Sequence, residues 1–267
     1  MKSLIINADD VGFSDAINEA AKECFLAGSI TGVSLMTRGA RFDEAASMLR
    51  EIGKKDAGVH LTLTGPCGTF AESYRDLAMR YFLGKVDLGE IYAELSGQIK
   101  KVRDAGLEVT HLDGHEHVHM FPDILRLTIR LAKEYGVPYI RFPLEVSSIM
   151  MKSFSLKDLV RHFSLAAFIP VGKKCLQASG LKCNEYFFGH FHAGRIDSEV
   201  FRFMLDNLRE GVTELAVHPS VRSESFYRES PWYKNTGEEF NALIEKGWKE
   251  LLPALGIRLV PHKKVIF

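Results

Sequence analysis

The sequence predicts an α/β protein whose parallel strands and covering helices form a TIM-like (β/α) barrel of seven or eight strands. Short β-branched runs alternate with longer segments of helical period along the 267 residues. Polar side chains follow the predicted strands at their carboxyl ends, which converge on one face of a barrel. The turn after the first strand, NADDVGFS, lacks the G-x-G-x-x-G motif of the competing architecture, an open doubly wound dinucleotide-binding sheet.

The strands are expected where short apolar or β-branched runs lie between turn residues. In order along the chain they are Ser3–Asn7, Gly32–Met36, Gly58–Leu63, Glu108–Leu112, Pro138–Phe142, Asn184–Phe188, Thr213–Val217 and Ile257–Val260.

The helices are expected between these strands, and a glycine follows most of them, as is common after a helix C-terminus. Ser14 is a candidate N-cap for the first helix, and Pro122 suits a first helical position. The expected helices are Ser14–Ala27, Arg41–Ile52, Leu88–Ala105, Pro122–Tyr135, Ser198–Arg209 and Glu238–Leu252.

Two segments interrupt this alternation, Thr64–Val86 and the amphipathic Leu144–Leu181. Each is either a lid or specificity wall beside the site or an extra helical hairpin covering the barrel, and the two readings are compatible. We therefore expect one domain, residues 1–267, with two long loop insertions.

The composition excludes several classes of protein. Lys plus Arg and Asp plus Glu both number 34, so the chain has no broad basic field for nucleic acid. No run reaches the about 18 apolar residues of a membrane span. The start, MKSLIINADD, is typical of a buried strand rather than a signal peptide, and the four cysteines lack a CxxC spacing. We expect a cytoplasmic protein; its oligomeric state stays open.

Histidine is the unusual feature, since four of the 10 histidines lie within HLDGHEHVHM at positions 111–120. Histidines that follow a strand, with an aspartate two residues away, are typical metal ligands. Gly114 is expected to end the strand, and Asp113 could accept a hydrogen bond from a ligand imidazole. Spacing alone leaves open whether His115, His117 or His119 would bind the metal.

Other strand ends add titratable side chains. Asp9 and Asp10 follow the first strand, where they could cap the next helix or bind a metal and a substrate. His60 lies on the polar side of the strand GVHLTLTG, where it could equally be a core residue. Arg141 in YIRFP could orient a carboxylate or form an ion pair, and His218 in AVHP could act as a general acid or as a structural hydrogen-bonding group.

Several of these segments together resemble the YdjC-like carbohydrate deacetylase family. The matching motifs are NADDVGFSDAINEA, GVHLTLTG, THLDGHEHVHMFPDI, YIRFP and TELAVHPS, from residue 4 to about 220. The resemblance implies a TIM-barrel-like fold and metal-dependent hydrolysis of the N-acetyl group of an amino sugar, a chito-oligosaccharide or a glycolipid, with release of acetate. The stretch GVPYIRFPLE also resembles a subgroup associated with hopanoid lipid biosynthesis.

The family pattern further implies roles for individual residues. Asp10, His60 and His115 would hold one divalent metal ion, Asp9 would be the general base and His218 the general acid. The donor set suits Zn²⁺, Mn²⁺ or Co²⁺ better than Mg²⁺, although Mg²⁺ also fits.

We expect substrate contacts from four more residues, namely Arg141, His117, Asp113 and Trp232. Aromatic side chains commonly cover sugar rings, and the candidates are Phe13, Phe187, Phe188, Trp232 and Tyr233. His190 and His192 take no role from the resemblance, because FFGHFHAG departs from the small-residue turn of relatives. His111 and His119 are expected near the site, whereas His162 and His262 are expected to be incidental.

Two other classes of function stay open on the sequence. One is a different metal-dependent barrel enzyme, a phosphoesterase or a sugar isomerase; a phosphoesterase with two metals about 3.5–4 Å apart would need further acidic ligands. The other is a non-catalytic, metal-dependent sugar-binding protein, whose metal would have no open coordination position.

Overall fold

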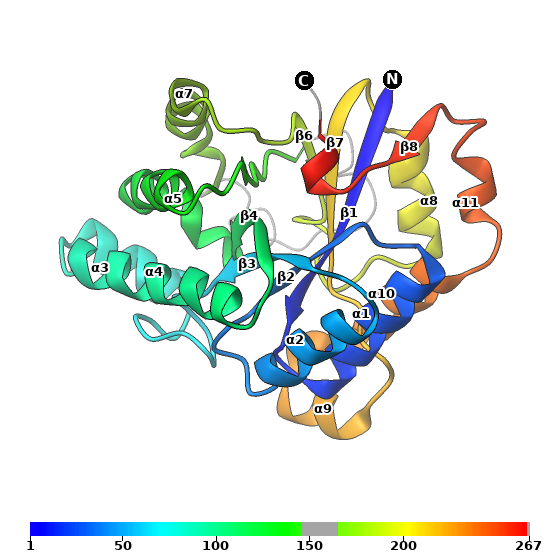
Figure 1. Ribbon diagram of the computed structural model, residues 1–267, viewed down its shortest axis with the longest axis horizontal. Helices are drawn as coiled ribbons and strands as arrows, with labels where there is room; N and C mark the ends of the chain where they lie inside the picture. Colours follow the sequence, from blue (N-terminus) through cyan, green and yellow to red (C-terminus); the bar gives the residue numbers. More distant parts are fainter. Residues whose placement is uncertain (146–164, 266–267) are drawn as a thin grey trace.

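A curled parallel sheet with helices packed around it forms the framework of the computed structural model, which describes residues 1–145 and 165–265 (Figure 1). The sheet order is β5-β4-β3-β2-β1-β7-β6, with β8 paired to β1. The strands are β1 (Lys2–Val11), β2 (Gly32–Leu35), β3 (Asp56–Leu61), β4 (Glu108–Gly114), β5 (Tyr139–Ile140), β6 (Tyr186–Phe188), β7 (Gly211–Val217) and β8 (Ile257–Leu259).

The predicted barrel is correct in its curvature and its parallel strands, but the sheet is not a closed TIM barrel. In the described residues, the edge strands β5 and β6 do not pair with each other. Isolated bridges instead join Tyr139 of β5 to Lys182, and Phe187 of β6 to Glu145. The last strand, β8, does not fill this seam, because it pairs with the start of β1 at Lys2–Leu4. The result is a seven-strand half-barrel with β8 beside its centre.

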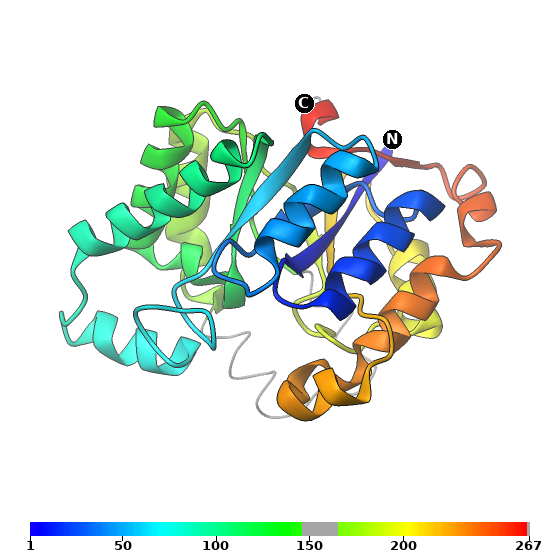
Figure 2. The ribbon, with the colours of Figure 1, turned by 60° about the horizontal axis from the view of Figure 1, so that its bottom comes forward.

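Helices cover the outer face of the sheet, as Figure 2 shows for α1 and α2. The helices are α1 (Asp15–Ala27), α2 (Phe42–Glu51), α3 (Tyr74–Phe82), α4 (Leu88–Asp104), α5 (Pro122–Glu134), α7 (Ile169–Ser179), α8 (Ser198–Asp206), α9 (Glu224–Glu229), α10 (Thr236–Ile244) and α11 (Trp248–Leu251). Short 3₁₀ helices are η1 (His115–Met120), η3 (Pro231–Asn235) and η4 (His262–Lys264). The predicted N-cap is confirmed, since Ser14 Oγ accepts a hydrogen bond from the Ile17 N–H.

Some boundaries differ from the sequence prediction. The expected helix Glu238–Leu252 is two helices, α10 and α11, because the chain turns at Gly247 with φ +100°. The connection Thr64–Val86 contains α3, and the described part of Leu144–Leu181 contains α7. Residues 146–164 of that second segment lie outside the described residues, as does His162.

The inside of the half-barrel is polar, in contrast to the apolar layer between the sheet and its helices. Arg141, Glu214 and His111 are each fully buried there. Gly58 makes room for this interior, since a Cβ at Gly58 would lie 2.1 Å from His111 Nε2. No described helix is long and apolar enough to cross a membrane.

Candidate active site

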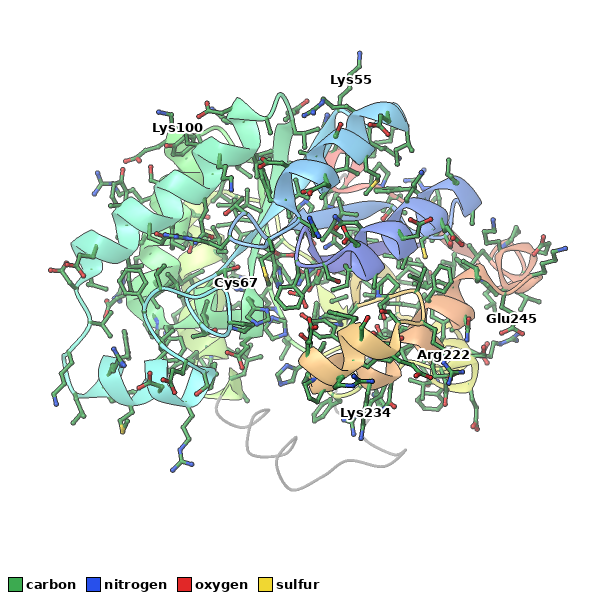
Figure 3. All side chains as sticks on the ribbon, turned by 90° about the horizontal axis from the view of Figure 1, so that it is seen from below. Lys55, Cys67, Lys100, Arg222, Lys234 and Glu245 are labelled. Carbon is green, nitrogen blue, oxygen red and sulfur yellow. The ribbon has the colours of Figure 1, made fainter. Side chains whose placement is uncertain are left out.

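The carboxyl ends of the central strands meet at a pocket of about 380 Å³. The strand ends supply titratable side chains, and the loops that follow supply the walls. Its lining includes Asp9, Asp10, Phe13, His60, Cys67, His115, Glu116, His117, His190, His218, Glu229, Trp232 and Tyr233. Figure 3 looks from below at this end of the molecule, with Cys67 of the pocket wall near the centre.

A bulge at the end of β1 directs two consecutive carboxylates to the pocket. Strand β1 runs to Val11, so Asp9 and Asp10 lie within the strand rather than after it. Its register with β2 shifts between Ala8 and Val11, and Asp10 has φ +59°. Neighbouring side chains of a regular strand point to opposite faces, whereas this left-handed residue lets both line one pocket.

Asp10, His60 and His115 form a compact cluster. Their potential ligand atoms all lie within 4.8 Å of one another. Oδ1 of Asp10 lies 3.2 Å from His60 Nε2 and 3.1 Å from His115 Nδ1. The predicted set of one carboxylate and two imidazoles is thus assembled from β1, β3 and the turn after β4.

The potential around this cluster favours a cation. Burial disfavours charge on His60, but Asp113 and Asp9 overcome that effect and raise the pKa of His60 to about 10. Burial likewise opposes ionisation of Asp10, yet His115 and His60 hold the pKa of Asp10 well below its ordinary value. The same negative potential would stabilise a metal ion at these nitrogens, so the residues fit a divalent cation.

A second group, Asp9, His60 and Asp113, also has its ligand atoms within 4.8 Å. In this second group, the guanidinium of Arg141 already supplies the positive charge that a metal ion would otherwise bring. Its guanidinium donates to both oxygens of Asp9 at 2.6 and 2.7 Å, and it lies 2.7 Å from Asp113 and 2.6 Å from Glu214. Of the two groups, the one containing Asp10 is therefore the better metal site.

Two of the four predicted substrate contacts, Arg141 and Asp113, lie outside the pocket. Arg141 and Asp113 have no exposed surface and do not line the pocket. Asp113 instead accepts a hydrogen bond from His60 Nδ1 at 2.8 Å, which leaves Nε2 facing Asp10. Both residues lie beneath the site, where they orient Asp9 and His60 rather than meet a ligand.

The histidine run separates into three environments. Gly114 ends the strand as expected, and the turn that follows holds Glu116 and His117 at φ +51° and +57°. His115 faces Asp10, and His117 lines the pocket wall with its ring 5.1 Å from that of His190. His119 is buried and its Nε2 lies 3.0 Å from the carbonyl of Arg141. Among these three, only His115 joins the cluster of potential ligands.

His218 lies across the pocket floor from the cluster, directly after β7. Its Nε2 is 4.0 Å from Asp9 Oδ2, and its ring meets that of Trp232 edge-on at 5.1 Å. Its backbone N–H donates to Glu239 at 2.5 Å. Burial lowers the pKa of His218, although Asp10 and Asp9 act in the opposite direction.

Two residues support the site in ways that the sequence did not indicate: Tyr233, which was a candidate only for covering a sugar ring, and Ser34, which had no expected role. Tyr233 donates its hydroxyl to Asp10 Oδ2 at 2.8 Å, and burial together with Asp10 raises its pKa well above the ordinary value. Ser34 donates to Asp113 at 2.6 Å and contacts His111 Nε2 at 3.0 Å. Tyr233 lies in an aromatic loop after β7, far in sequence from any strand end, and Ser34 lies near the end of β2 as a neutral serine among apolar neighbours.

Comparison with known proteins identifies the family of this chain. A family model described as YdjC-like protein matches residues 3–254. The chain belongs to the YdjC-like family. A carbohydrate deacetylase of Brevibacillus brevis is 28% identical to it over 98% of this chain and 99% of that protein. A human carbohydrate deacetylase is 35% identical over 82% of this chain and 75% of its own length.

Two further similar proteins match less of the chain or share only its fold. A chitooligosaccharide deacetylase of Salmonella paratyphi B is 35% identical over 50% of this chain and 57% of that protein. A solved structure from Enterococcus faecalis V583, described as a proposed cellobiose-phosphate cleavage protein, has a TM-score of 0.76 at 24% identity, covering 100% of this chain and 99% of the other. This last likeness concerns the fold alone.

Proposed function

We propose that this YdjC-like protein is a metal-dependent hydrolase that removes the N-acetyl group of an acetylated amino sugar and releases acetate. One observation carries the proposal. The three potential ligands Asp10, His60 and His115 lie within 4.8 Å at the floor of a pocket that Asp9 and His218 also line. The deacetylase names of the relatives support the same reaction.

Amide hydrolysis needs an activated water, a polarised carbonyl and a protonated leaving amine. Asp10, His60 and His115 would hold one divalent cation, which when bound supplies Lewis acidity toward water and carbonyl oxygen. Three protein ligands are the number typical of catalytic sites, since they leave room for water and substrate.

Asp9 is the proposed general base. Burial opposes its charge, but Arg141 and His60 lower the pKa of Asp9 to about 2. The bidentate Arg141 contact therefore keeps the carboxylate ionised and fixes its orientation. A base with so low a pKa holds a proton only briefly, so a neighbouring acceptor is needed.

His218 is the proposed acceptor and general acid. Because burial lowers its pKa, the imidazole is neutral before reaction at neutral pH. Its Nε2 lies 4.0 Å from Asp9, a separation that one water molecule would span, so the imidazole would receive the water proton through that water and then protonate the departing amine. The backbone N–H of His218 donates to Glu239, which fixes the backbone here, and the His218 ring lies edge-on to Trp232.

The substrate is proposed to be an N-acetylated chito-oligosaccharide or a glycolipid bearing such a sugar. Trp232 is 48% exposed beside His218 and offers an aromatic face for a sugar ring. His117 lies on the opposite wall, next to His190, where it can hydrogen-bond hydroxyl groups. Phe13 belongs to the pocket lining, whereas Phe187 is fully buried behind His117.

Two-metal phosphoester hydrolysis is less well supported. The second potential ligand group shares His60 with the first, and Arg141 occupies its carboxylates. A purely sugar-binding role leaves Asp9 and His218, which both face the pocket, without a purpose.

The test is acetate release from N-acetylated chito-oligosaccharides by the purified protein, before and after chelation. We expect acetate release to stop when chelator is added and to return when Zn²⁺, Mn²⁺ or Co²⁺ is added. Release that continues in chelator would contradict the metal mechanism. No release from any acetylated amino sugar, with metal bound, would contradict the reaction class.

A further inference from the structure

A tyrosine from the far end of the chain contacts the proposed metal site. The hydroxyl of Tyr233 donates to Oδ2 of Asp10 at 2.8 Å, across 223 positions of sequence. The other oxygen, Oδ1, lies 3.1 to 3.2 Å from the nitrogens of His115 and His60. The two oxygens of Asp10 thus face different partners.

Tyr233 is held rigidly in this position. It is 6% exposed, its ring stacks on Phe13 with centroids 5.4 Å apart, and it also packs against Phe226 at 5.0 Å. Its N–H donates to the Ser230 carbonyl at 3.0 Å, and Thr236 Oγ1 donates to its carbonyl at 2.8 Å. The hydroxyl therefore cannot turn away from Asp10 without disturbing the packing of η3.

We propose that Tyr233 is a positioning residue that commits Asp10 to binding the metal through Oδ1 alone. This inference rests on the proposed function. If Oδ2 also turned to a cation, the buried hydroxyl would lose its acceptor, which costs about 1–3 kcal/mol. Restricting Asp10 to one oxygen keeps coordination positions free for water and the acetyl oxygen.

The same contact connects the metal site to the substrate wall. Tyr233 adjoins Trp232 in η3, and Trp232 packs on His218. One short segment therefore contacts both a proposed ligand and the proposed general acid. Hydrogen bonds to ligands from such outer residues commonly change metal affinity by about 10- to 100-fold.

The variant that tests this inference is Tyr233→Phe, which removes only the hydroxyl. Tyr227→Phe is the matched control, because the Tyr227 hydroxyl contacts Ser220 at 3.2 Å and no proposed ligand. Metal affinity is measured by calorimetry with Zn²⁺ or Co²⁺ alone, and coordination by the visible absorption of bound Co²⁺. Thermal unfolding of the metal-free proteins shows whether each variant is folded.

We expect Tyr233→Phe to bind metal about 10- to 100-fold more weakly and to change the Co²⁺ absorption bands, with Tyr227→Phe like the wild type. Unchanged or tighter affinity in Tyr233→Phe, unchanged bands, or an equal loss in Tyr227→Phe overturns the inference and leaves the proposed function standing. A folded wild type that binds neither ion overturns both. If Tyr233→Phe does not fold, Tyr233→His, which can keep a donor in the ring, must restore folding and part of the affinity.

Discussion

Arg141 and Asp9 form a bidentate ion pair inside the half-barrel, with nitrogen–oxygen distances of 2.6 and 2.7 Å and no solvent contact for the guanidinium. The same guanidinium also reaches Asp113 and Glu214. One cation therefore forms ion pairs with three buried carboxylates. The proposed base Asp9, the His60 partner Asp113 and the interior residue Glu214 therefore all depend on the side chain of Arg141.

Replacing this cation should destabilise the protein strongly. Arg141→Met leaves buried carboxylates unpaired, and breaking such a pair typically costs about 3–5 kcal/mol. Arg141→Lys keeps the charge but loses the two-pronged contact, so we expect an intermediate loss. Urea denaturation of the metal-free proteins measures both. Wild-type stability in Arg141→Met would show that the carboxylates do not depend on Arg141.

Lowering the pH should destabilise the folded protein, because Glu214 then becomes protonated. Burial opposes its ionisation, but Arg141 and His262 lower the pKa of Glu214 from 4.5 to about 2. A lowered pKa stabilises the folded state above the unfolded value, and this stability disappears as the pH falls from about 4.5 through 2. The shift corresponds to about 3 kcal/mol. Asp9 adds to the same trend.

The measurement for Glu214 is the free energy of unfolding at pH 5 and pH 3, for wild type and Glu214→Gln. The wild type should lose more stability over this interval than the variant, in which the Asp9 and Asp10 contributions remain but that of Glu214 is gone. Identical slopes would mean that Glu214 titrates alike in the folded and unfolded chain.

Trp232 should act through substrate binding. Trp232→Ala removes the exposed ring beside His218, and we expect kcat/KM to fall about tenfold, or about 1.4 kcal/mol, mainly through KM. Trp232→Phe keeps an aromatic face and should retain most of the activity. Steady-state kinetics on an acetylated chito-oligosaccharide decides this. A fall in kcat at constant KM would instead assign Trp232 to holding His218.

The convergence of Asp10, His60 and His115 was predictable from the sequence, because parallel strands in one sheet bring their carboxyl ends to one edge. The position after the strand predicted a histidine ligand, but spacing alone could not separate His115 from His117 and His119. The family resemblance supplied that choice, and the left-handed turn at Glu116 and His117 supplies its physical reason.

Contacts between distant segments were not predictable. Arg141 ends a strand, where we expected a substrate contact or an ion pair. The structure shows ion pairs with three carboxylates inside the half-barrel, and the sequence did not identify these partners. His262 was expected to be incidental, yet its ring stacks on His111 at 3.5 Å in the same interior. Such partners depend on how far the sheet curls, which periodicity does not encode. The same holds for the edges β5 and β6, which in the described part of the chain are not neighbours in the strand order.

The central claim is that one metal site, formed by Asp10, His60 and His115, works beside a separate base, Asp9. The most direct measurement is metal content together with acetate release for Asp9→Asn and His115→Ala. Asp9→Asn should keep about one metal ion per chain and lose turnover by about 10²- to 10⁴-fold, whereas His115→Ala should lose the metal as well. Equal metal loss in both variants, or full turnover in Asp9→Asn, would contradict the account.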